Sequence, residues 1–414
     1  MHELKFSLKF GVFLLMPTIT VAAQVKPAAT GPWVPVPPGQ LKYALRYSQS
    51  VESGESLGTW QTSTMSGSLD YSNQSERLPF NMIYGGGYNW IISGPDYNAG
   101  LFQHLLISQA IAGRRWSVSV SDNVSYTPEA PTFGFTGIPG VGEPIAGQNP
   151  AASSPDQSIL TLSTNVLDNA ASAEAMHNLS PATVLSAGGS YNILRFPDGN
   201  GINTNDVAVN GGLNWRLDAR DSFFGNYVFS EFAYPDYHFS FQTNSGLAGF
   251  KRVWSRKITT NISVGPEWTS SSNTIAVPSS LGVTANAALS YKFGYSSAGL
   301  NYSRGINGGA GYLIGAETDS ASASYSRQFG RELVVGATGS YMRTAALANR
   351  GSTAAKYGGA EATWQLGKHW TVFGNYTAMT QSTSASLPGN ALGQLIQTFS
   401  FGIGLSSPQI NLRR

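Results

Sequence analysis

The 414-residue chain contains no cysteine, which excludes disulfides, thiolate metal sites and cysteine nucleophiles. Charged residues make up only 12% of it, about half of the share found in soluble globular proteins. The formal net charge is +2, which argues against nucleic acid as a partner, since such partners select strongly basic surfaces. After the first 23 residues no segment approaches 18 consecutive apolar residues, so the sequence predicts no transmembrane helix.

The first residues, MHELKFSLKFGVFLLMPTITVAAQ, have the pattern of a secretory signal peptide. A basic start precedes an apolar run, and the small residues V-A-A at 21–23 form a cleavage site. The apolar run is too short to serve comfortably as a membrane anchor. We predict that residues 1–23 are removed and that the proline-rich residues 24–40 form an extended periplasmic lead-in.

Glycine is frequent, with 47 residues, and the rest of the chain is dominated by alternation with a period of two. In GVTANAALSYKFGYSSAGLNYSRG (282–305), the apolar series is Val283, Ala285, Ala287, Leu289, Tyr291 and Phe293. This alternation is typical of a strand with one apolar face. We predict 18 strands across residues 41–405, followed by a tail at 406–414. They begin near residues 41, 58, 80, 101, 116, 158, 184, 206, 223, 239, 258, 283, 297, 319, 332, 356, 370 and 396.

Short and long connections alternate along the chain. The short turns include Gly113–Arg115 and Gly367–His369, and between the short turns lie long loops rich in Gly, Pro, Ser and Asn. The segment 169–183 is an exception, because it is long where a short turn is expected. A soluble sandwich has no reason to place all of its long loops at one end, whereas a membrane barrel has short periplasmic turns and long external loops.

Aromatic residues gather near both ends of the predicted strands. Trp116, Trp215, Trp254, Tyr291, Tyr325, Trp364 and Trp370 lie beside short turns. Tyr126, Tyr191, Tyr227, Trp268, Tyr302, Tyr341 and Tyr376 lie toward the long loops. Two such rings are expected at the two boundaries between water and lipid.

These patterns resemble the bacterial outer-membrane β-barrels, and more narrowly the porin-like channels of 16 to 18 strands. The resemblance covers residues 41–405 and implies an all-β fold, a transmembrane antiparallel up-and-down β-barrel of about 18 strands. It also implies outer-membrane lipid and the barrel assembly machinery as partners, and it is compatible with a homo-oligomer. One departure is that the chain continues past Leu405, where such barrels usually end on an aromatic residue.

In porins the third external loop folds into the lumen as a constriction. Here the third external connection, 128–157, is the longest of the predicted connections, so the resemblance suggests it as the candidate constriction loop. The alternative, that this loop packs over the rim or against a neighbouring subunit, is equally compatible with its composition. Its candidate residues are Glu129, Phe133, Phe135, Glu143 and Asp156.

The inward register is mostly Ser, Thr, Asn, Gln and Gly, with scattered charges and no ladder of Arg or Lys. We therefore predict a pore lined by hydroxyl and amide groups with weak charge. The candidate pore-lining residues are Asp70, Arg216, Glu267, Asn286, Ser290, Lys292, Asn301, Glu332 and Glu361.

No histidine has the spacing of a metal site, and we expect neither metal nor cofactor. His238, with Asp236 and Ser240 nearby, superficially offers a nucleophile, a base and an acid, but an ordinary loop accounts for these residues equally well. We therefore expect a protein that is not an enzyme.

The function that we expect is passive diffusion of small polar solutes, neutral or weakly cationic, through an outer-membrane channel. One alternative is a conduit for polysaccharide export, which neighbouring glycan-synthesis genes would favour. A second is a plugged structural or adhesive barrel, which would be closed to solutes and whose loss would weaken the cell envelope.

Overall fold

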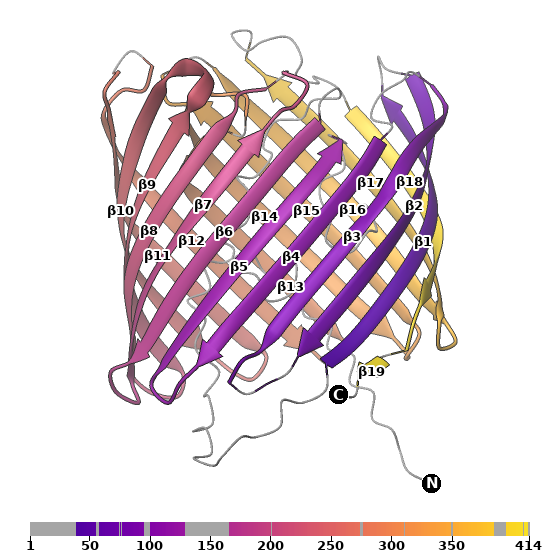
Figure 1. The fold of residues 1–414 in the computed structure, drawn as a ribbon, viewed down its shortest axis with the longest axis horizontal. Helices are drawn as coiled ribbons and strands as arrows, with labels where there is room; N and C mark the ends of the chain where they lie inside the picture. Colours follow the sequence, from indigo (N-terminus) through magenta and orange to yellow (C-terminus); the bar gives the residue numbers. More distant parts are fainter. Residues whose placement is uncertain are drawn as a thin grey trace.

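The computed structural model describes residues 39–412 except 55–57, 74, 76, 95–99, 129–164, 200, 274–275, 310, 349–350, 385–394 and 409. The predicted signal peptide and nearly all of the predicted lead-in lie outside the described residues. Within them the chain forms a closed barrel of 18 antiparallel strands in chain order, which confirms the predicted fold class (Figure 1). The described residues contain no helix that is long and apolar enough to cross a membrane.

The strands have the following bounds: β1 (Gly39–Gly54), β2 (Gly58–Asn73), β3 (Phe80–Ser93), β4 (Gly100–Ala112), β5 (Trp116–Pro128), β6 (Asn165–Asn178), β7 (Thr183–Arg195), β8 (Thr204–Arg216), β9 (Asp221–Tyr234), β10 (Phe239–Val253), β11 (Ile258–Ser271), β12 (Ser280–Phe293), β13 (Ser296–Asn307), β14 (Ala316–Phe329), β15 (Leu333–Ala346), β16 (Ser352–Leu366), β17 (Trp370–Thr383) and β18 (Leu395–Ser406). A short 3-10 helix, η2 (Pro235–Tyr237), connects β9 to β10.

The first and last strands close the barrel. β1 pairs with β18 from Ala44–Ser406 to Gly54–Ile396, so neither strand is left as a free edge. Closure matters because hydrocarbon offers no hydrogen bonds to an unpaired backbone N–H or C=O group. Three residues of the predicted tail, Ile410–Leu412, continue this wall as β19, which pairs with Gly39–Leu41 of β1.

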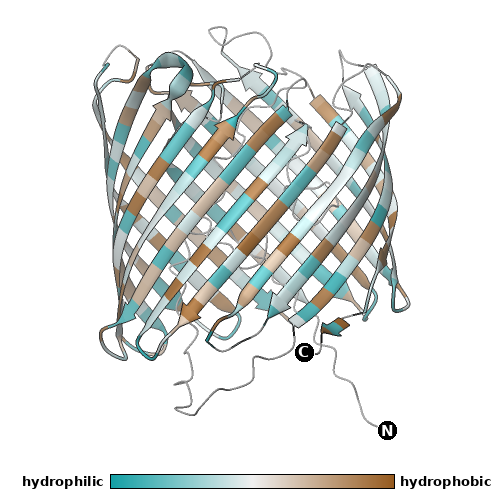
Figure 2. Cartoon of the chain, viewed as in Figure 1, coloured by the Kyte–Doolittle hydropathy of each residue, from teal (hydrophilic) through white to brown (hydrophobic). Residues whose placement is uncertain are grey.

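The two faces of the wall differ as the alternation predicts. Along each strand, apolar and polar residues alternate, as the banding in Figure 2 shows. All but one of the aromatic residues predicted at the strand ends are exposed on the outer face, among them Trp116, Trp215, Tyr302 and Tyr376. The remaining one, Tyr126, is partly exposed. Because large apolar side chains cover the outside, the wall fits a lipid environment, and the lumen receives the polar register.

The sixth strand corrects one prediction. We expected it near residue 158, with a long connection at 169–183, but β6 runs from Asn165 to Asn178 and a four-residue turn joins it to β7. The segment NAASAEAMHN is rich in alanine, which has a low β propensity and gives a weak apolar signal. The periplasmic turn after β6 is therefore short, like the other turns at that end of the barrel.

The turn between β8 and β9 depends on one carboxylate. Asp218 Oδ1 accepts hydrogen bonds from the backbone N–H groups of Arg220 (2.6 Å) and Asp221 (2.8 Å). These hydrogen bonds lower the pKa of Asp218 below its ordinary value of 3.8. A lowered pKa means that the stabilisation is present above the ordinary value and is lost as the pH falls through the lowered one.

We predict that the amide resonances of Arg220 and Asp221 titrate together, with a midpoint below pH 3.8, in NMR spectra of the folded barrel. Asp218→Ala removes the acceptor and should abolish this titration. Asp218→Asn is the matched control, because its side-chain oxygen still accepts the hydrogen bonds but does not titrate. A midpoint above 3.8, or one unchanged in Asp218→Ala, contradicts the prediction.

Candidate functional site

The candidate site is the inner wall of the barrel together with its external mouth. Eight of the nine predicted pore-lining residues lie on the register opposite to the exposed apolar residues and so face the lumen. They are Asp70, Arg216, Glu267, Asn286, Ser290, Lys292, Asn301 and Glu361. The ladder of β12 illustrates the geometry, because Asn286 is flanked on the strand by Ala285 and Ala287, which are on the outer face.

Glu332 does not belong to this wall. It lies in the exposed periplasmic turn between β14 and β15, where its backbone C=O accepts a hydrogen bond from the N–H of Gln365. The prediction was wrong because β15 begins at Leu333, one residue later than expected. The five candidate residues of the 128–157 loop, Glu129, Phe133, Phe135, Glu143 and Asp156, lie outside the described residues.

The structure adds charged residues to the lumen that the sequence reading did not name. These inward-facing residues are Lys42, Arg46, Glu52, Asp168, Glu174, Asp206 and Lys251. Most of them are found when every second residue is assigned to the lumen from the bounds of each strand. Asp168 could not be found in this way, because alternation alone did not locate β6 correctly.

Charges of the two signs are unevenly distributed along the lumen. Within four residues of the external ends of their strands lie the acids Glu52, Asp168, Asp206 and Glu267. Within three residues of the periplasmic ends lie the bases Lys42, Arg216, Lys251 and Lys292. Among described residues the external part of the lumen is therefore acidic, whereas the periplasmic part holds these bases together with the acids Asp70, Glu174 and Glu361.

Hydroxyl and amide groups of the inner wall bond to one another across neighbouring strands. The hydroxyl oxygens of Ser121 and Ser172 lie 2.7 Å apart, and those of Ser297 and Ser326 are also 2.7 Å apart. Near the external end, Asn192 Nδ2 donates to Asp206 Oδ2 at 3.0 Å. Such groups can also donate to and accept from water and neutral polar solutes, which suits an aqueous lumen.

Tyr234, at the external end of β9, holds the connection between β13 and β14. Its hydroxyl donates to the backbone C=O of Gly308 at 3.0 Å and accepts from the N–H of Gly315 at 2.8 Å. The side chain is fully buried (0% exposed), and its ring stacks on those of Phe239 and Phe241. Both ends of this glycine-rich connection are therefore fixed to one tyrosine.

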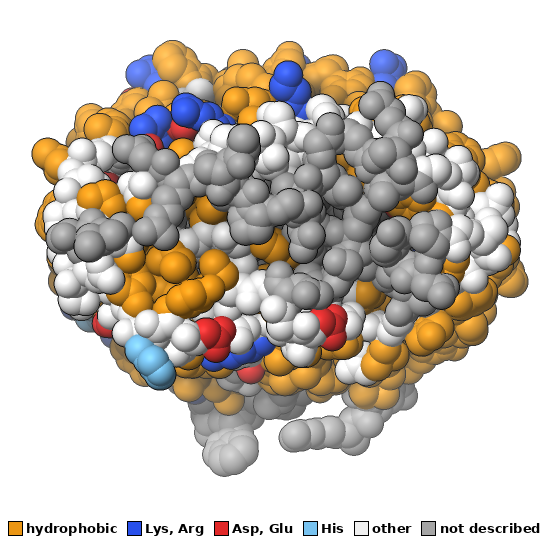
Figure 3. All heavy atoms as spheres, turned by 90° about the horizontal axis from the view of Figure 1, so that it is seen from above, with side chains coloured by type: hydrophobic (Ala, Val, Ile, Leu, Met, Phe, Trp, Pro, Cys, Tyr) orange, Lys and Arg blue, Asp and Glu red, His pale blue; other side chains and the backbone are white. Residues whose placement is uncertain are grey.

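The same connection also reaches the loop after β7. The N–H of Ile202 donates to the C=O of Gly311 at 2.6 Å, and the rings of Phe196 and Tyr312 meet edge to face at 5.7 Å. In the strand order, β7 and β13 are separated by six positions, so this contact crosses the mouth and does not follow the wall. Figure 3 looks onto this end of the barrel, where apolar side chains gather inside the rim.

The sequence did not reveal that the connection 308–315 lies across part of the external mouth. The stretch GGAGYLIG at 308–315 looks like an ordinary external loop. Its glycines permit the path, because Gly309, Gly311 and Gly315 have positive φ angles of 81°, 80° and 69°. A Cβ atom on Gly311 would also lie about 2.1 Å from the ring of Phe196, so the close packing requires glycine there.

His238, which the sequence places near Asp236 and Ser240, lies on an exposed hairpin tip. His238 follows η2 with a left-handed backbone (φ 49°), and its N–H donates to the C=O of Pro235. Its role in the structure is thus to end a short helical turn. In the described parts of the chain, no group of three or more His, Asp or Glu side chains is arranged to hold a metal ion.

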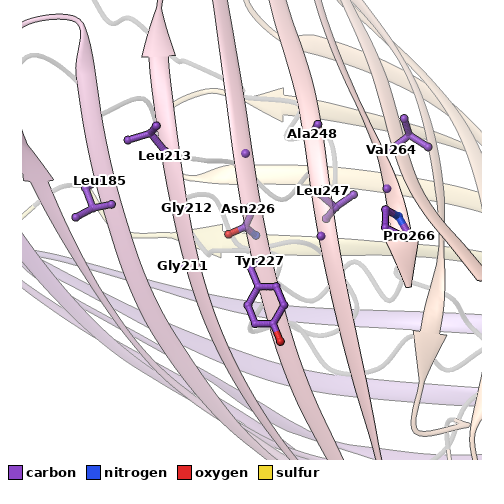
Figure 4. Close-up of a pocket in the computed structure, with 13 residues that line it drawn as sticks. Leu185, Gly211, Gly212, Leu213, Asn226, Tyr227, Leu247, Ala248, Val264 and Pro266 are labelled. Carbon is purple, nitrogen blue, oxygen red and sulfur yellow. The ribbon is translucent and has the colours of Figure 1, made fainter. Parts of the chain in front are cut away.

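A depression of about 620 Å³ lies on the outer wall across β7 to β11 (Figure 4). Its floor contains the outward glycines Gly211, Gly225 and Gly246, and its edges include the exposed side chains of Leu213 and Val264. Because it lies on the lipid-facing register, we do not assign it to solutes.

No protein-family model and no curated protein sequence matches the chain. Among solved structures it is similar to OccAB4 of Acinetobacter baumannii, with a TM-score of 0.50 and 11% identity over 91% of this chain and 99% of that one. It is also similar to OccK2 (OpdF) of Pseudomonas aeruginosa, with a TM-score of 0.47 and 10% identity over 89% and 98% of the two chains. At these identities the likeness concerns the fold alone. The chain thus has the fold of an outer-membrane porin, a closed 18-stranded up-and-down β-barrel.

Proposed function

We propose that the protein is an outer-membrane channel for passive diffusion of small polar solutes that are neutral or weakly cationic. The observation that carries this proposal is the contrast between the two faces of a closed wall. Apolar residues cover the outside, while Ser, Thr, Asn and scattered charges face a lumen enclosed by 18 strands. A barrel of this size has room for an aqueous path.

The charge distribution supports a preference for cations at the entrance. Solutes that come from outside first meet the acidic end of the lumen, with Asp168, Asp206 and Glu267. The described inward-facing acids also outnumber the inward-facing bases. The preference should be weak, because the bases at the periplasmic end act in the opposite direction.

The external mouth supports a limit on solute size. The connection 308–315 crosses part of the mouth and is held there by Tyr234, Phe196 and Ile202. A narrowed entrance favours small solutes over polymers. We therefore prefer diffusion of small molecules to polysaccharide export.

The proposal is tested by reconstituting the purified barrel into planar bilayers and into liposomes. We expect steady single-channel current with mild cation preference, and swelling of liposomes in neutral polyols that declines as the polyol becomes larger. Absence of current and swelling from protein that is shown to be folded would refute the channel and favour the plugged barrel.

Asn286→Arg combined with Ser290→Arg should shift the reversal potential in a salt gradient toward anion preference, since both side chains face the lumen on β12. Two added charges that approach a permeating ion in a confined pore should change the permeability ratio several-fold, on the order of 1 kcal/mol. Tyr295→Arg is the control, because Tyr295 is exposed in the turn between β12 and β13, outside the wall. An equal shift in both proteins would remove the β12 residues from the pore.

Tyr234→Phe should release the connection 308–315, because it removes both hydrogen bonds of the hydroxyl group. Each bond is worth about 1 kcal/mol, so amide exchange at Gly315 should accelerate about tenfold or more. Permeation of the larger polyols should rise in parallel. Tyr237→Phe is the control, since that residue is exposed on the neighbouring hairpin tip. An unchanged rate of amide exchange at Gly315 would show that the Tyr234 hydroxyl group does not hold the connection in place.

A further inference from the structure

The segments that connect the strands carry opposite charges at the two ends of the barrel. In the sequence, the external connections contain a single base, Arg350, and seven acids, which are Glu55, Asp96, Glu129, Glu143, Asp156, Asp198 and Asp236. The periplasmic turns contain only three acids, Glu76, Asp218 and Glu332. The same turns hold eight bases, so the periplasmic rim is positive where the external rim is negative.

The eight bases of the periplasmic turns are all exposed, and we call them the basic collar. They are Arg77, Arg114, Arg115, Arg220, Arg256, Lys257, Arg331 and Lys368. They come from six of the eight periplasmic turns, from the turn between β2 and β3 to the turn between β16 and β17. Because the strands follow one another around a closed wall, the basic collar surrounds the rim (Figure 1).

The basic collar lies next to the periplasmic ring of aromatic residues. Trp116 directly follows Arg115, and Trp370 lies two residues after Lys368. Both tryptophans are exposed on the outer face of the wall. Aromatic rings of this kind mark the boundary between lipid and water, where the lipid headgroups lie. The short turns therefore hold the bases at the height of the headgroups.

Two more arginines on the outer face lie at this boundary. The guanidinium carbon of Arg252 is 4.4 Å from the centre of the Trp254 ring, and that of Arg327 is 4.8 Å from the centre of the Phe329 ring. Arg252 also lies 3.6 Å from the carboxylate of Asp221. A guanidinium group that stacks on an outward ring stays near the headgroups while its apolar stem covers the wall.

The composition and shape of the basic collar fit phosphate groups of lipids. Six of its eight residues are arginines, whose planar fork of donors matches the oxygens of a phosphate group. A protein partner would contact one sector of the rim, whereas lipid headgroups surround the whole rim as the bases do. Bases close to a membrane surface also gain affinity for anionic lipids from the surface potential.

We propose that the basic collar binds the headgroups of anionic phospholipids in the periplasmic leaflet of the outer membrane. The proposal goes beyond the proposed channel function, because the collar lies in the turns and not on the inner wall. A barrel that conducts but shows no lipid preference would therefore refute the lipid site and leave the channel intact.

The test is electron spin resonance of spin-labelled lipids around the folded barrel in phosphatidylcholine bilayers. We expect labelled phosphatidylglycerol to associate with the barrel about fivefold more strongly than labelled phosphatidylcholine, the factor expected for one base near the surface. Addition of 1 M salt should remove most of the difference, since the collar is exposed to water. Equal association of the two lipids, or a preference that persists in 1 M salt, would overturn the proposal.

Matched variants separate the basic collar from the other bases of the barrel. Replacing three collar residues by glutamine, Arg256→Gln, Lys257→Gln and Lys368→Gln, should lower the preference about twofold, in proportion to the charge removed. The control is Lys42→Gln with Lys251→Gln and Lys292→Gln, which removes the same charge from the same end of the barrel but from the inner wall. The control should keep the preference of the unmodified protein. An equal loss in both folded variants, or no loss in the collar variant, would overturn the role of the basic collar.

Discussion

Every feature of this molecule depends on the need to pair each backbone N–H and C=O group inside a hydrocarbon layer. A sheet with free edges fails this requirement, and the pairing of β1 with β18 meets it. Closure then separates an outer face from an inner one, and the period-two alternation of the sequence fills them with different side chains. Because β1 begins and β18 ends at the periplasmic side, the external side is left to the longer connections (Figure 1).

The inner face combines neutral polar groups with charges that are unevenly distributed along the lumen. Bases such as Lys251 and Lys292 lie at the periplasmic ends of their strands, and acids such as Asp206 and Glu267 lie toward the external ends. The outer face is mostly apolar, with the charged pair Arg304 and Asp319 near the external ends of β13 and β14 and with Asp122 in the middle of β5. Because neighbouring residues on a strand point in opposite directions, one wall presents two surfaces of different chemistry, a polar lumen and a mostly apolar outer face.

How well the fold could be predicted depended on the strength of the local alternation. β12 alternates bulky apolar residues such as Leu289 and Tyr291 with polar ones, and its faces were assigned correctly. β6 alternates alanine with Ser, Glu and Met, so its position was misjudged and Asp168 was overlooked. An error of one residue at the start of β15 placed Glu332 on the wall, although it lies in a turn. An error in the bounds of a strand does not change which of its central residues face the lumen. It does misplace residues at the ends of the strand.

Periodicity along each strand was enough to predict the barrel, a wall of about 18 strands, the two aromatic rings and five of the twelve inward charges. Which residues meet across the barrel depends on the tertiary structure. Tyr234 and the glycines of 308–315 are far apart in sequence, and so are Phe196 and Tyr312. Local pattern contains no information on such contacts, since they depend on how closure curves the wall and brings distant strand ends to one mouth. The pairing of Asp122 with Asn169 likewise became visible only when the register of β5 and β6 was fixed.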